Sequence, residues 1–158
     1  MELKKFFGFA LLLNATTVLP LSAFADSDKN PVADTPTKAI QYLERFFEED
    51  DVDAVLSLYR EDSVYIFPPG SPPIQGLDAI RELVEVLEEN GRNLKLSPRH
   101  IHQNGDMALV VVDWDMEMRG ESGEYEEFVG TAVDVLKKSE DGSWYYYIDN
   151  PFGSAEAE

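Results

Sequence analysis

The sequence predicts an α+β domain in which three helices pack on a strongly curved, mostly antiparallel sheet. Apolar residues recur at three- and four-residue spacing in the first half of the domain, as on one face of a helix. The second half instead holds long runs rich in β-branched and aromatic residues. Asn104-Gly105 and Asp141-Gly142 separate these runs and are typical of tight hairpins between antiparallel strands. Helices followed by a meander of strands form an α+β arrangement.

The three helices are predicted from their apolar stripes and their ends. A first helix is expected over residues 37–47, before an acidic break. Asp51 is placed to cap the second helix, whose expected inward-facing residues are Val52, Val55, Leu56 and Tyr59. The third helix is expected over 78–89, because Asn90-Gly91 is a natural stop.

The strands are predicted from β-branched and aromatic runs between turn residues. Prolines after Phe67 end the first strand, because proline cannot donate a ladder hydrogen bond. The expected strands cover residues 63–67, a very short piece at Ile74, 94–103, 107–118, 125–138 and 144–150. A curved sheet with helices across its concave side would form a cone that encloses an apolar pocket.

The first 25 residues are typical of a secretory signal peptide. Lys4 and Lys5 precede an apolar stretch, and Ala23-Phe24-Ala25 supplies a small-x-small cleavage site. A membrane anchor is the alternative, but Pro20 and polar residues interrupt the apolar stretch, which is short for a bilayer. We therefore expect cleavage after Ala25 and a periplasmic or secreted protein without a membrane anchor.

The predicted mature chain has three parts. Residues 26–36 form a polar linker with prolines, residues 37–153 form the domain, and residues 154–158 form an acidic tail. The whole sequence carries a formal net charge of −18. That charge disfavours nucleic acid and anionic membranes as partners and favours neutral or cationic ligands at long range.

Known cofactor and nucleophile motifs are absent from the sequence. It has no phosphate loop, dinucleotide fingerprint or nucleophile elbow, and it contains no cysteine. We therefore expect no cofactor and no serine-triad or cysteine-dependent hydrolysis. His100 and His102 are the only histidines, and they share one strand face. Such a pair can chelate zinc or copper when carboxylates converge, but no third ligand stands at a suggestive spacing, so no metal is expected.

The first candidate catalytic residues lie on adjacent strands. Asp113 and Asp115 share one strand face and can form a carboxylate pair in which one pKa is raised. The alternative is that both lie on the solvated face of the strand. His100 is a candidate general base near neutral pH.

Asp149 is the candidate acid on the last strand. It follows an aromatic run, Trp144 to Tyr147, and apolar surroundings would raise its pKa. Alternatively, it bonds the backbone at the turn before Pro151. Aromatic residues are the expected lining of a pocket for a hydrophobic ligand: Tyr42, Tyr59, Tyr65, Phe67 and Trp114.

Several segments together resemble one known family. They begin with Ala39 to Tyr59 and its acidic break, and continue with the following list: Glu61-Asp62-Ser63-Val64, Pro69-Gly70, Asp78-Ala79-Ile80-Arg81, Asp113-Trp114, 131–136, Asp141-Gly142-Ser143-Trp144 and 148–153. In this order they resemble the ketosteroid isomerase-like, or SnoaL-like, branch of the nuclear transport factor 2-like superfamily. The resemblance implies a conical fold, an apolar pocket and frequent homodimers packed sheet to sheet. It does not imply one chemistry.

The groups that ketosteroid isomerases use are missing here. Those enzymes need a carboxylate base, a tyrosine and a protonated aspartic acid. The resemblance places these positions at Phe67, at about Leu43 and at about Gly130, which are chemically silent. Ketosteroid isomerase activity is therefore not expected.

Three hypotheses for function follow from the sequence. The first is binding of a small, largely apolar molecule in the cone pocket. The second is a cofactor-free acid–base enzyme of the isomerase, dehydratase or hydrolase type. An acid–tyrosine or acid–histidine pair beside a cavity would favour this hypothesis. The third is a protein-interaction module that uses the open sheet face.

Overall fold

The computed structural model of the protein describes residues 31–120 and 122–153. The predicted signal peptide (1–25), the first part of the linker and the acidic tail (154–158) lie outside these ranges. The described chain runs through these elements: α1 (Pro36–Glu48), α2 (Val52–Leu56), β1 (Val64–Tyr65), β2 (Ile74–Gln75), α3 (Leu77–Asn90), β3 (Gly91–Asn104), β4 (Met107–Arg119), β5 (Tyr125–Lys138) and β6 (Trp144–Asp149).

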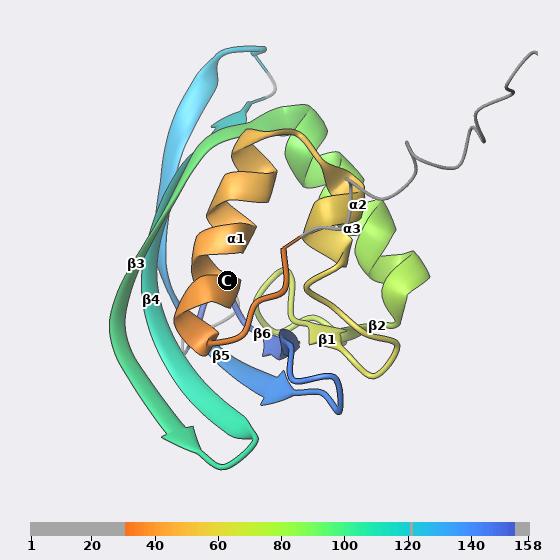
Figure 1. The fold of residues 1–158 in the computed structure, drawn as a ribbon. Coiled ribbons are helices and arrows are strands. Elements are labelled where there is room, and N and C mark those ends of the chain that lie inside the picture. The colour runs from red at the N-terminus through yellow and green to blue at the C-terminus, as the bar shows by residue number, and fades with distance from the viewer. Residues whose placement is uncertain (1–30, 121, 154–158) are drawn as a thin grey trace, which may run out of the picture.

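The strands form one sheet in the order β2-β1-β6-β5-β4-β3. All neighbours are antiparallel except β1 and β6, which run parallel. The long strands β3, β4 and β5 curve around the helices, which lie on the concave side (Figure 1). The predicted α+β fold, with helices on a curved and mostly antiparallel sheet, is confirmed.

Helix α1 is positioned by a cap at its start and by its apolar face. The Thr35 hydroxyl accepts a hydrogen bond from the Lys38 amide at 3.2 Å, and Pro36 occupies the first turn, where its missing N–H costs nothing. Ile40 and Phe46 are buried against the sheet. Just before the helix, Ala33 is buried and its carbonyl accepts from the Trp144 amide at 2.7 Å. This end of the expected linker is therefore part of the domain.

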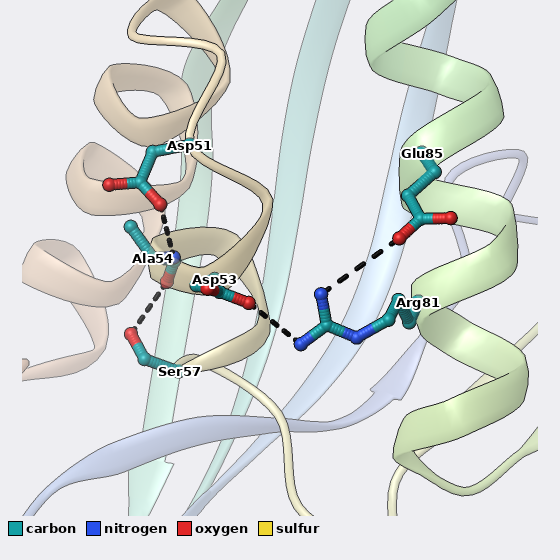
Figure 2. Close-up of polar contacts among 6 residues, drawn as sticks. All are labelled: Asp51, Asp53, Ala54, Ser57, Arg81 and Glu85. Carbon is teal, nitrogen blue, oxygen red and sulfur yellow. Dashed lines mark hydrogen bonds and ion pairs between the residues drawn. The ribbon is translucent and has the colours of Figure 1, made fainter.

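Helices α2 and α3 are joined by polar contacts at their exposed sides (Figure 2). The predicted cap is present, because the Asp51 carboxylate accepts from the Ala54 amide at 2.9 Å. Arg81 of α3 pairs with Asp53 at 2.7 Å and with Glu85 at 3.9 Å. These exposed pairs add little stability, so the apolar core between helices and sheet holds α3 in place. None of the helices in the described ranges is long and apolar enough to cross a membrane.

Some element boundaries differ from prediction; α2, for example, ends at Leu56, before Tyr59. β1 has only two residues, because the chain leaves the sheet before the proline-rich loop. β3 begins at Gly91, directly after α3, three residues earlier than expected. A Cβ at Gly91 would lie 2.6 Å from the Leu87 carbonyl oxygen and 2.6 Å from Met116 Cε. Only glycine fits where helix and strand join so closely.

A bulge in β6 decides which of its side chains face the helices. Leu136 of β5 pairs with Tyr146, but the next residue, Val135, pairs with Ile148, so Tyr147 is an extra residue. Uninterrupted alternation from the buried Tyr146 would turn Ile148 inward. With the bulge, Asp149 points inward instead and is only 5% exposed.

Candidate functional site

A cavity of about 100 Å³ lies between the helices and the concave face of the sheet. Its walls are mostly apolar and aromatic side chains from the helices, the sheet and the segments that connect or follow them. They are Leu43, Phe47, Val55, Tyr59, Tyr65, Phe67, Val84, Leu87, Leu94, Leu96, Val112, Trp114, Met116, Ala132, Tyr146, Pro151 and Phe152. Two carboxyls, Asp134 and Asp149, complete the lining. A single water needs only roughly 15 Å³ by this measure, so the space can hold a small molecule.

The two carboxyls lie on neighbouring strands. Asp134 of β5 is 3% exposed and Asp149 of β6 is 5% exposed. The Tyr59 hydroxyl donates to Asp149 Oδ2 at 2.5 Å. The Asn150 amide donates to Asp134 Oδ1 at 2.9 Å. Among the described residues, the second oxygen of each carboxyl has no hydrogen-bond partner, so each can receive one from a ligand.

The two carboxyls differ in protonation. Burial raises the pKa of Asp149 to about 6, although the Tyr59 hydrogen bond lowers it. Burial, and then the charge of Asp149, raises the pKa of Asp134 well above its usual range, while the Asn150 amide acts in the opposite direction. At neutral pH, Asp149 is therefore mainly ionised, and burial and the charge of Asp149 favour the protonated form of Asp134. One site thus holds a negatively charged hydrogen-bond acceptor beside an acid whose protonated form is favoured.

Three tyrosines surround the carboxyls. The ring of Tyr59 stacks on Tyr146 at 5.6 Å and on Tyr65 at 6.4 Å between centroids. Burial raises the pKa of all three hydroxyls well above the usual range. They remain protonated at neutral pH and act as neutral groups.

A second part of the cavity wall is formed by the aromatic residues Phe67, Trp114 and Phe152. Phe152 packs against Phe67 at 5.8 Å and meets Trp114 edge-on at 5.6 Å. The Trp114 indole donates to the Pro151 carbonyl at 2.5 Å, which holds the C-terminal turn over the cavity. A Cβ at Gly130 would lie 2.5 Å from the Trp114 ring. The indole therefore fills the position where the resemblance would place the second acid of an isomerase.

Comparison with known families identifies the domain. A family model for the SnoaL-like domain matches residues 39–147. This chain belongs to the SnoaL-like domain family. The match covers most of the helices, the sheet and the cavity lining, and it confirms the family predicted from the sequence. Three lining residues, Asp149, Pro151 and Phe152, lie beyond it. A comparison with curated proteins found no match.

Solved structures share the fold of this SnoaL-like domain at low sequence identity. A proposed calcium/calmodulin-dependent protein kinase type II association domain from Thiobacillus denitrificans has a TM-score of 0.64 at 19% identity, covering 79% of this chain and 99% of that chain. A ketosteroid isomerase-like protein from Erwinia carotovora atroseptica has a TM-score of 0.63 at 22% identity, covering 72% and 88%. A protein of the nuclear transport factor 2-like family from Streptomyces avermitilis, proposed to be a dehydratase, has a TM-score of 0.58 at 18% identity, covering 71% and 89%. These likenesses confirm the nuclear transport factor 2-like fold.

Asp149 is the candidate acid that the structure places in the cavity. Asp113, Asp115 and His100 lie on the opposite, outer face of the sheet. Asp113 pairs with Arg99 at 2.5 Å and accepts from the Thr131 hydroxyl at 2.8 Å. The Arg99 bond, followed by the Thr131 bond, lowers the pKa of Asp113. Of the two interpretations of Asp113 and Asp115, the structure therefore favours the one in which both lie on the solvated face of the strand.

The histidines also lie outside the cavity. His100 and His102 are both exposed, and their rings stack at 5.9 Å. Within the ranges 31–120 and 122–153, no group of three or more acidic, histidine or cysteine side chains is arranged to hold a metal ion.

Four of the five predicted lining residues line the cavity: Tyr59, Tyr65, Phe67 and Trp114. Tyr42 does not, because its ring turns along α1 to stack on Phe46 at 5.6 Å, beneath Arg45. Asp134 was not among the sequence candidates. Its signal was available in β5, where it stands at an inward position between Ala132 and Leu136, at which an apolar residue is expected.

We predict that Asp149 makes the protein less stable as pH rises. A carboxyl whose folded pKa of about 6 exceeds its unfolded value stabilises the fold below the unfolded pKa, and this contribution is lost as pH rises through the folded pKa. The loss for Asp149 is on the order of 3 kcal/mol of unfolding free energy between about pH 4 and about pH 8. Urea unfolding across this range should show a markedly smaller fall in D149N.

Asp113→Asn serves as the control for this titration. The pKa of Asp113 is lowered, so its contribution is lost towards acid pH instead. D113N should keep the fall of the wild type above about pH 4. Equal pH profiles for D149N and the wild type would show that the Asp149 carboxyl titrates normally.

Proposed function

We propose that this SnoaL-like domain binds a small, largely apolar molecule inside the cavity. The cavity itself carries this proposal: its apolar walls close around two buried carboxyls that keep unpaired oxygens. Such a site combines hydrophobic contact with a few orienting polar groups, as small-molecule sites do. A cavity between the helices and the sheet also favours a pocket ligand over a protein-interaction module, which would need only the open face of the sheet.

The cost of burying the two acids supports the same proposal. A buried carboxylate without an ionic partner destabilises a fold, and a neutral or apolar residue would fill the core at lower cost. Asp134 and Asp149 hold no structural ion pair among the described residues, since each has a single hydrogen-bond donor. Buried ionisable groups that destabilise the fold and form no structural ion pair are typical of ligand sites.

Acid–base catalysis is the second candidate function. The observation that favours it is the bond from Tyr59 to Asp149, which orients a carboxylate whose pKa of about 6 suits a general base near neutral pH. Asp134, whose pKa is raised by burial and by the charge of Asp149, stands beside it as the candidate proton donor. A bound compound that wild type converts and D149N leaves unchanged would establish catalysis; binding without conversion in both would leave the binding function alone.

Binding can be tested with benzene as a probe and with two matched substitutions on α3. Val84 lines the cavity and is 3% exposed, whereas Val86 on the same helix is 54% exposed. We expect benzene to shift the methyl NMR signals of Leu43, Leu96 and Val112 in wild type and in V86F. V84F should abolish these shifts, because the phenyl ring fills the cavity.

Two outcomes would contradict the binding proposal. One is the absence of methyl shifts in wild-type protein at saturating benzene. The other is an unchanged response in V84F. Thermal unfolding of both variants shows that they are folded before binding is compared, and L87F, also at the cavity wall, replaces V84F if that variant does not fold.

We further propose that the protein is exported and acts as a homodimer packed through the outer face of its sheet. The signal-like sequence up to Ala25 supports export. For the dimer, the support is an apolar outer face on β4 and β5, where Leu109 is 44% and Val129 is 70% exposed. Val135, opposite Leu109, and the pair Val111–Val133 extend this face, and the pair Asp113–Thr131 lies between them and Val129.

Native mass spectrometry tests export and dimerisation together. The full-length sequence would be expressed in a bacterium and the protein recovered from outside the cytoplasm. We expect a mass equal to two chains that begin at Asp26, because cleavage follows Ala25. V129E should shift the population to monomer by placing charge in the interface. A chain that keeps residues 1–25, or a monomer at micromolar concentration, would contradict the respective proposal.

A further inference from the structure

The charge of the cavity suggests which molecules it takes. It holds two buried carboxyls, Asp134 and Asp149; at neutral pH Asp149 is mainly ionised, and the surrounding tyrosines are neutral. None of the described residues that line the cavity is a lysine, arginine or histidine. No cationic side chain of the described lining therefore offsets the negative charge of Asp149. Among the described residues, Tyr59 is the one hydrogen-bond donor to the Asp149 carboxylate.

We infer that the cavity takes a small organic ammonium ion, whose charged nitrogen pairs with Asp149 while its hydrocarbon part fills the apolar walls. This inference rests on the proposed binding function and names the class of its ligand. The second oxygen of Asp149 has no partner among the described residues and can accept a hydrogen bond from an ammonium N–H. Pairing removes the cost of leaving the carboxylate unpaired in an apolar site.

The rings around Asp149 support a cation independently of the carboxylate. Tyr59, Tyr65 and Tyr146 form a stacked group beside it, and Phe67, Trp114 and Phe152 form a second aromatic group in the cavity lining. The faces of aromatic rings attract cations, and rings arranged as a cage are a known means of binding ammonium groups. The same rings also provide the apolar surface that the hydrocarbon part of the ligand needs.

Charge outside the cavity acts in the same direction. The chain carries a formal net charge of −18, which raises the local concentration of cations and lowers that of anions. An anionic ligand would meet this field and then a buried carboxylate without any cationic side chain to offset it. A neutral ligand would fill the walls but leave the charge of Asp149 unpaired.

The volume limits the size of the ligand. An engineered cavity of roughly 150 Å³ in another protein holds one benzene molecule. The cavity here, at about 100 Å³, suits a molecule of about that size or smaller. Isoamylamine is a suitable probe, because it is a branched chain of that size with a single ammonium group. Isoamyl alcohol and isovalerate keep its hydrocarbon part and replace the cation by a neutral group and an anion.

Protonation of Asp149 should switch off the preference for a cation. The titratable groups that face Asp149 are Tyr59 after α2, Tyr65 of β1, Asp134 of β5 and Tyr146 of β6. Helices α1 and α3 contribute only apolar side chains to the described lining. The tyrosines are neutral at neutral pH, and burial and the charge of Asp149 raise the pKa of Asp134. The negative charge of the site therefore disappears as Asp149 becomes protonated in acid.

Calorimetric titration of wild-type protein with the three isoamyl probes tests the inference. Near neutral to slightly basic pH, about pH 8, we expect isoamylamine to bind about tenfold more tightly than isoamyl alcohol, as a charge-assisted hydrogen bond would give. Isovalerate should bind least. At about pH 5, below the pKa of Asp149, the advantage of the amine over the alcohol should shrink to about twofold or less.

D149N should remove the advantage of the amine at every pH and leave alcohol binding in place, whereas D113N, on the outer face, should behave as wild type. Equal affinity for amine and alcohol in wild type, or an amine advantage that persists in D149N, overturns the inference. If D149N does not fold, the pH dependence of the wild type decides the matter alone. Benzene binding without an amine preference would overturn only this inference, whereas failure of benzene and all three probes to bind would overturn the binding function as well.

Discussion

The extra residue in β6 determines what the cavity contains. A strand alternates its side chains between two faces, and Tyr146 faces the helices, so Ile148 would be next to turn inward. The bulge at Tyr147 shifts this phase by one residue and brings Asp149 in instead. From there Asp149 reaches the Tyr59 hydroxyl and stands next to Asp134. Without this shift, the interior of the cone would be an ordinary apolar core with one isolated acid.

Two buried acids in an apolar core weaken the fold, and the rest of the domain offsets that cost. The helices cover the concave face with apolar stripes, and the largest buried side chains include Tyr59, Tyr146 and Phe46. Aromatic packing of this extent contributes far more than one carboxylate removes. The acids also lie where the packing is incomplete, so their unpaired oxygens open onto space that a ligand can fill. A ligand that pairs with Asp149 would then stabilise the folded state by its own binding energy.

The sequence predicted the fold well because its local signals agree with one another. The stripe around Phe46, the cap at Asp51 and the turn at Asn104-Gly105 each lead to the observed element. It predicted the site only in part. Asp149 was recognised as a candidate, but a bulge has no residue type of its own, so the face of Asp149 stayed open. Asp113, like Asp149, is an aspartate in a strand rich in apolar residues, but it lies outside the cavity and pairs with Arg99. Which of two similar aspartates is buried depends on pairing between distant strands, and local pattern does not carry that information.

The central claim is that Asp149 and Asp134 are two neighbouring buried carboxyls that have no cationic partner inside an apolar cavity. The most direct test is NMR titration of their side-chain carboxyl carbons in the unliganded protein, from about pH 3 to about pH 9. The structure predicts that Asp149 titrates near pH 6 and that the pKa of Asp134 lies well above the ordinary aspartate value. Titration of both carboxyls near the ordinary aspartate value, about 3.9, would contradict the account, because it would place them in water or beside a cation.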